Sequence, residues 1–150
     1  MGILVSGIIY KGEILAEKKF YPEDGFITEN VLGDLFQGIF QFVDITFHDD
    51  LHKFSIGNYS VLIIAKHMSQ SADPDEEKHP VLIFSIIEKD TGEKPVLNAM
   101  EKALDQFFNR YSNFDIRSLN KQKMAKFSSR LEDIFSDLAL KLEDRFKALY

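Results

Sequence analysis

The fold is indicated most clearly by the stretch VLIIA at residues 61–65, where five apolar residues follow one another without a polar break. A second run, VLIFSII at residues 81–87, is interrupted only by Ser85. Strands with one face in water alternate apolar and polar residues, so continuous apolar runs predict strands that are covered on both faces. The sequence therefore predicts a sheet that lies between two layers of helices.

Further β-prone segments surround these two runs, and short turns separate them. Lys11-Gly12-Glu13 and Gly57-Asn58 contain residues that tolerate the left-handed backbone of tight hairpins, so each connects two antiparallel neighbours. The turn at Asp90-Thr91-Gly92 ends the last of these segments. The predicted strands are Ile3 to Tyr10, Ile14 to Phe20, Leu51 to Ile56, Tyr59 to His67 and Val81 to Glu88.

Three helices are predicted from one-sided apolar stripes. The first runs from about Glu29 to Val43, with Thr28 as its N-cap. The second follows Pro95 and ends near Asn113, and the third begins around Gln122. Because one helix precedes the three-strand meander and two follow it, the simplest arrangement places the first helix on one face of the sheet and the other two on the opposite face. We expect a single domain over residues 1–150.

Composition and charge exclude several classes of protein. The chain has 45% hydrophobic residues, which supply a substantial core, and it contains no cysteine, so disulfides and thiol chemistry are absent. A formal charge of −6 argues against nucleic acid as a partner. No apolar run approaches the roughly 18 residues needed to span a bilayer, and no secretory signal is visible, so we expect a cytoplasmic protein.

No residue pattern predicts catalysis, a metal or a cofactor. The glycines are scattered among hairpins and turns without the spacing of a phosphate-binding loop. His48, Asp49, Asp50 and His52 are the one dense group of potential metal ligands, but they lie between a helix and a strand, where a solvated turn is expected. We predict a non-enzymatic protein without a bound cofactor.

The first predicted helix is apolar over more of its surface than packing on one sheet requires. Its apolar residues cover about half of the circumference, compared with the stripe of roughly 100° that a core-facing helix needs. Gly33 and Gly38 lie towards the edges of this apolar arc, and close approach of another backbone would explain their presence. Either a partner protein or a neighbouring loop covers the additional apolar surface.

A basic run stands out in this acidic chain. Its members are Arg117, Lys121, Lys123, Lys126 and Arg130, and no acidic residue lies between them. Lysines near a helix N-terminus oppose the helix dipole, which is mildly unfavourable for stability, and contact with anionic lipid headgroups or an acidic partner surface is one explanation for their placement. A plain solvated helix face is the alternative.

The order of elements, the Lys11-Gly12-Glu13 hairpin between two N-terminal strands and the Gly57-Asn58 hairpin within the meander together resemble the longin domain family. The resemblance covers nearly the whole chain. It implies an α+β fold of three layers, in which a five-stranded antiparallel sheet has one helix on one face and two on the other. Longin domains belong to trafficking SNAREs, adaptor small subunits and tethering complexes, so the resemblance implies a non-enzymatic adaptor in vesicle trafficking or small-GTPase regulation.

In that family the first helix and the adjoining edge of the third strand commonly bind another longin or roadblock domain, or a small GTPase. The resemblance therefore implies a homodimer or a protein partner, and an archaeal counterpart as one setting. The basic run adds peripheral membrane contact as a further alternative. No SNARE heptad helix or membrane anchor follows, so a fusion SNARE is not expected. Carried onto this chain, the partner-binding residues are Val31, Leu35, Gly38, Phe42, Leu51, Lys53 and Ser55.

One alternative remains open. Profilin-like and PAS-like domains share this general architecture and bind a small molecule between the sheet and the helices. No polar residue in the predicted core favours such a sensor. A ligand that binds only the folded state would raise the thermal midpoint, which separates the two hypotheses.

Overall fold

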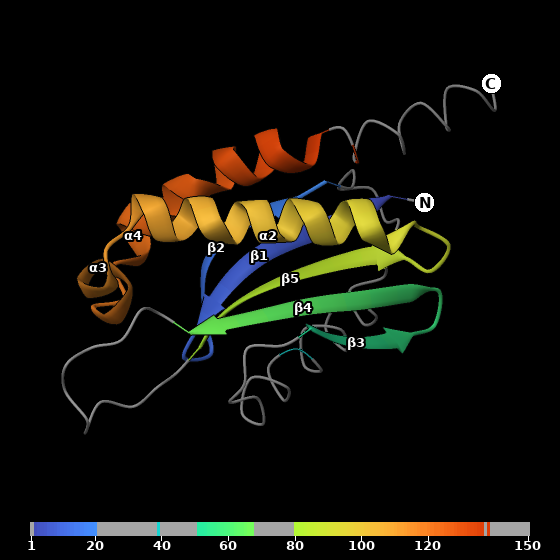
Figure 1. Cartoon of the computed structure of the whole chain (residues 1–150), viewed down its shortest axis with the longest axis horizontal. Coiled ribbons are helices and arrows are strands. Elements are labelled where there is room, and N and C mark those ends of the chain that lie inside the picture. Colours follow the sequence, from blue (N-terminus) through green and yellow to red (C-terminus); the bar gives the residue numbers. More distant parts are fainter. Residues whose placement is uncertain (1, 21–38, 40–50, 68–79, 137, 139–150) are drawn as a thin grey trace.

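The computed structural model describes residues 2–20, 39, 51–67, 80–136 and 138, and Figure 1 shows how they are arranged. They form an α+β fold in which helices pack on a five-stranded antiparallel sheet. The strands are β1 (Ile3–Tyr10), β2 (Glu13–Lys19), β3 (Leu51–Ile56), β4 (Tyr59–His67) and β5 (Pro80–Glu88). The helices are α2 (Glu93–Arg110), α3 (Asn113–Arg117), α4 (Lys121–Met124) and the 3₁₀ turn η1 (Ala125–Phe127), which leads into helical residues 128–136.

The five strands lie in the order β2-β1-β5-β4-β3. Both predicted hairpins are confirmed, since β1 pairs with β2 and β3 pairs with β4, each in antiparallel register. The first turn is tighter than predicted: Glu13 already belongs to β2, and Lys11 and Gly12 both have positive φ. Strand β5 joins the two hairpins because it pairs with β1 on one side and with β4 on the other.

Each face of the sheet carries a buried apolar cluster. The larger cluster unites β1, β2, β4 and β5 with α2, α3, α4 and the residues after it, as Leu62, Phe107 and Phe127 illustrate. The opposite cluster contains Val61, Phe84 and Ile39. This explains the continuous apolar runs in β4 and β5, whose successive side chains enter the two clusters alternately.

The predicted second and third helices pack on the same face, with local differences from the prediction. Helix α2 begins at Glu93 rather than after Pro95, because a proline in the first turn lacks an N–H that would have no intrahelical partner there. The third helix is not continuous: α4, η1 and residues 128–136 form its successive parts. The predicted first helix lies outside the described residues except for Ile39, which is helical and buried.

Gly7 is an exception to the interpretation of the glycines as turn residues. It lies in the middle of β1 and pairs directly with Phe84 of β5. A Cβ atom at position 7 would lie 2.6 Å from Cε1 of the Phe84 ring and 3.1 Å from the carbonyl oxygen of Ala16. Glycine is therefore required here by the close approach of an aromatic ring rather than by a turn.

Candidate functional site

Strand β3 forms an edge of the sheet, and among the described residues its backbone pairs only with β4. Lys53 and Ser55 are exposed on this strand. The other predicted partner-binding residues Val31, Leu35, Gly38 and Phe42 lie outside the described residues, and of Leu51 only the backbone is described.

The structure places the side chains of Lys53 and Ser55 on the α2 side of the sheet. Lys53 forms an ion pair with Glu93 at the start of α2, and Ser55 Oγ lies 3.1 Å from Ser60 Oγ. Ile39 lies in the opposite cluster, where Phe54 packs instead. The side chains of Lys53 and Ser55 therefore lie on the face of the sheet opposite to Ile39. The backbone edge of β3 can be approached from either face.

The basic run lies on α3, on α4 and on the helical residues that follow. The fold brings acidic residues to two of its members: Lys121 forms an ion pair with Glu13 of β2, and Lys123 Nζ lies 3.2 Å from Asp115 Oδ2. Arg130 donates from Nε to Gln106 Oε1 of α2 at 2.7 Å. The run is therefore less of a free positive patch than its sequence indicates, because tertiary contacts supply the carboxylates that the segment lacks.

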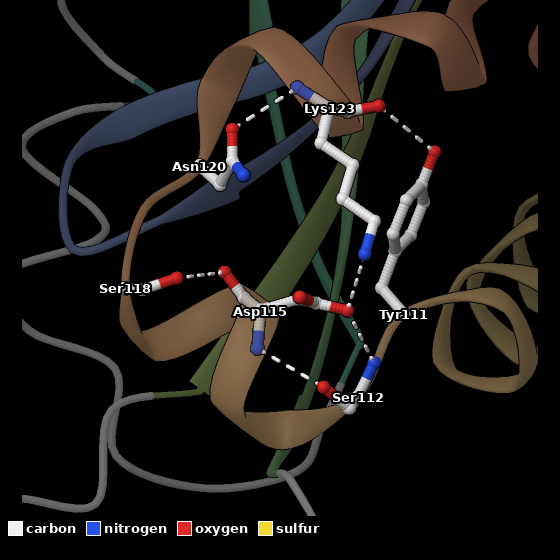
Figure 2. Close-up of polar contacts among 6 residues, drawn as sticks. All are labelled: Tyr111, Ser112, Asp115, Ser118, Asn120 and Lys123. Atoms are coloured by element: carbon white, nitrogen blue, oxygen red, sulfur yellow. Dashed lines mark hydrogen bonds and ion pairs between the residues drawn. The ribbon is translucent and has the colours of Figure 1, made fainter.

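Figure 2 shows how hydrogen bonds hold α3 and α4 against the end of α2. Ser112 and Asp115 form a capping box, in which Asp115 N–H donates to Ser112 Oγ at 3.1 Å and Ser112 N–H donates to Asp115 Oδ2 at 3.2 Å. Asn120 caps α4 by accepting from Lys123 N–H at 3.2 Å. The Tyr111 hydroxyl donates to the Lys123 carbonyl at 3.3 Å, so Lys123 contacts both preceding segments.

Two groups in this network have shifted pKa values. The hydrogen bond from Lys123, followed by that from the Ser112 backbone, lowers the pKa of the Asp115 carboxyl below its usual value. Burial raises the pKa of the Tyr111 phenol, and the nearby charges of Arg110 and Lys123 oppose that rise only in part. Around neutral pH the network therefore combines an ionised Asp115 with a neutral Tyr111.

An open hollow of about 400 Å³ lies between α2 and the segment that contains the basic run. Its described lining residues are Gln106, Asn109, Arg110, Phe127 and Arg130. The predicted basic run includes Arg130 but misses Arg110 and Gln106. Only the packing of α2 against this segment brings these residues together, so no local sequence pattern identifies the hollow.

No sequence pattern singles out Phe114 on α3. It has 79% of its surface exposed and is the one large hydrophobic residue so exposed among the described residues. Arg117 follows three positions later on the same short helix, so the two lie near each other on its surface. An aromatic residue and basic residues are therefore combined at this end of the molecule.

No group of three or more potential metal ligands occurs in the described part of the chain. The sequence-derived group His48, Asp49 and Asp50 lies outside that part, and the side chain of His52 is likewise outside it. Ser6 and Ser85 are buried, and both hydroxyls form hydrogen bonds: Ser85 Oγ donates to Ser6 Oγ at 3.2 Å, and Ser6 Oγ donates to the Phe84 carbonyl at 3.0 Å. These serines fill hydrogen-bonding positions within the sheet.

Among the described residues, no helix combines the length and the apolarity that crossing a membrane requires. In comparisons with known proteins, the chain matches no protein-family model and shows no significant match to a curated protein.

Proposed function

We propose that this chain is a non-enzymatic protein-interaction module of the longin type, which acts in membrane trafficking or small-GTPase regulation by dimerising or by binding a GTPase. The five-stranded antiparallel sheet with α2 and its successors packed on one face is compatible with this family. Ile39, helical and buried against the other face, supports a helix on that side.

The observation that carries the proposal is the position of β3 at the edge of the sheet. An edge strand presents backbone N–H and C=O groups that can pair with a strand of another chain. In a two-residue hairpin the pair next to the turn, here Ile56 and Tyr59, is hydrogen-bonded. Alternation along β3 then directs the N–H groups of Ser55 and Lys53 away from β4, towards an incoming strand.

A proline at position 55 tests this directly. Ser55→Pro removes an outward N–H while the hydrogen bonds to β4 remain, because edge strands accept proline at such positions. We expect it to weaken self-association or GTPase binding at least about tenfold. Ser55→Ala is the matched control, because it removes the hydroxyl contact with Ser60 and keeps the N–H.

Light scattering at several protein concentrations measures dimerisation. Titration with purified small GTPases, in the GDP-bound and GTP-analogue-bound states, measures GTPase binding. Circular dichroism must show both variants folded. The proposal fails if the unmodified chain is monomeric at all concentrations and binds none of the GTPases, or if Ser55→Pro and Ser55→Ala weaken association equally.

A further inference from the structure

The hollow between α2 and the segment carrying Arg130 has the size and chemistry of a ligand site. Its volume of about 400 Å³ lies within the range of roughly 300 to 1,000 Å³ that is typical of small-molecule pockets. Phe127 is fully buried, so the surface that the hollow presents to solvent is polar, and it comes from two different helical segments.

Both arginines line the same hollow. Arg130 reaches across to α2 and donates from Nε to Gln106 Oε1 at 2.7 Å. Arg110 follows Gln106 by four residues on α2, which places the two on the same side of the helix with Cβ atoms roughly 5 to 6 Å apart. Gln106 therefore holds Arg130 against the side of α2 that also carries Arg110.

Both guanidinium groups are held in place while most of their donors stay available. Arg130 uses its Nε for Gln106, which leaves the donors of its two terminal nitrogens. The Arg110 guanidinium lies 5.5 Å from the centre of the Tyr111 ring, a contact that uses none of its N–H groups. Since Gln106 Oε1 accepts from Arg130, the Gln106 amide N–H₂ adds further donors.

The described lining of the hollow contains no carboxylate, so its two positive charges lack a counter-charge there. A phosphomonoester carries about −1.5 to −2 charges at pH 7, whereas a carboxylate or a phosphodiester carries about one. We infer that this hollow binds a phosphomonoester group, held by Arg110 and Arg130 together. The site is distinct from the β3 edge and does not depend on the role proposed for it.

Two matched probes test the charge requirement. Methyl phosphate and methyl sulfate have nearly the same shape, but above the second phosphate pKa of about 6 the former is a dianion and the latter a monoanion. In NMR titrations of the ¹⁵N-labelled chain at pH 7.5 and low salt, we expect methyl phosphate to shift the side-chain signals of Arg110, Arg130 and Gln106. It should bind at least about fivefold more tightly than methyl sulfate, with a dissociation constant in the millimolar range.

Single substitutions separate a built site from general attraction by positive charge. Arg110→Gln and Arg130→Gln should each weaken methyl phosphate binding at least about tenfold, since each removes charge-assisted hydrogen bonds. Lys126→Gln removes one charge from an exposed residue one turn before Arg130 that is not among the described lining residues, and should change affinity less than about twofold. Gln106→Ala keeps the net charge and should still weaken binding, because Arg130 loses its partner.

A tighter complex with a phosphoserine peptide than with methyl phosphate would identify a phosphorylated protein segment as the source, and equal affinities would identify a small phosphorylated molecule. The inference is overturned if methyl phosphate gives no saturable shift at tens of millimolar, or if Lys126→Gln weakens binding as much as the arginine substitutions. Binding to phosphatidylserine vesicles without binding to methyl phosphate also overturns it, since the ligand would then be a membrane surface.

Discussion

Phe84 packs across the backbone of Gly7 where β1 and β5 run side by side. The missing side chain at position 7 gives the ring room between its own strand and the carbonyl of Ala16. Phe84 is fully buried and belongs to the cluster that also holds Ile39. Gly7 therefore determines how closely the Phe84 ring can pack on the backbone of β1.

We predict that Gly7→Ala lowers the free energy of unfolding by about 1 to 3 kcal/mol, because the added methyl group must displace the ring or bend β1. Chemical denaturation monitored by circular dichroism measures the loss. Gly92→Ala is the control: Gly92 has φ −61°, and the nearest atom to an added Cβ is Pro95 Cδ at 3.9 Å. Because Gly92 is the N-cap of α2, where alanine is disfavoured, that substitution should cost up to about 1 kcal/mol but without any steric clash. Equal or larger loss for Gly92→Ala than for Gly7→Ala would contradict the packing argument.

At the scale of elements, α3 has only five residues, so its own helical hydrogen bonds cannot sustain it. The capping box at Ser112, the bond from Ser118 Oγ to the Asp115 carbonyl at 2.9 Å and the ion pair with Lys123 fix it instead. Buried Ile116 also anchors α3 in the larger apolar cluster. The orientation of the basic run thus depends on a small polar network.

This network gives a prediction about pH. The pKa of Asp115 is lowered in the folded state, so its contribution to stability is complete above the unfolded pKa of about 3.9 and is lost as the pH falls through the lower folded value. We expect the stability difference between the unmodified chain and Asp115→Asn to be constant above about pH 5 and to shrink below about pH 4.

Unfolding curves measured from pH 3 to pH 7 test this. Lys123→Gln should reduce the difference, because it removes the largest cause of the pKa shift. A stability difference that stays the same across the whole range would show that Asp115 is not stabilised in its ionised form.

Sequence patterns predicted the strands well because their signals are local. The apolar runs of β4 and β5 and the glycine-containing turns are visible without tertiary information. Leu119 shows what is not visible: its φ of +53° allows the chain to turn between α3 and α4, and a leucine is not expected in that conformation. Neither α3 nor the break between α4 and residues 128–136 is therefore visible in the sequence pattern.

The candidate sites divide in the same way. The basic run is contiguous in sequence and could be found there, whereas its ion pair with Glu13 spans more than a hundred residues. The hollow forms only where Arg110 and Arg130 come together from separate segments. Strand register decides that the side chains of Lys53 and Ser55 lie on the face of the sheet opposite to Ile39. Each of these depends on how elements pack, which periodicity does not specify.

At the scale of the whole molecule, charge is distributed unevenly. The chain carries −6 overall, yet the segment from Arg110 to Arg130 contains six basic residues and one acidic residue. This segment lies at the end of the sheet where the β1–β2 turn is found, as Figure 1 shows. Local attraction for anions is therefore compatible with a chain that is acidic as a whole.

Amide hydrogen exchange should follow the order of the strands across the sheet. Strands β1, β4 and β5 are paired on both sides and have both faces buried, so we expect their amides to exchange only through global unfolding. Amides of β2 and β3 should exchange with opening free energies lower by at least about 1 kcal/mol. Measurements at low protein concentration keep β3 free of self-association, and uniform protection across all five strands there would contradict the prediction.

The placement of β5 between the two hairpins also matters while the chain is being made. On the ribosome, β1 and β2 emerge early and β3 and β4 follow, but neither two-stranded ribbon has a stable partner until residues 80–88 leave the exit tunnel. A nascent polypeptide that stalls before this point exposes two apolar β-hairpins, and we expect chaperones to bind it.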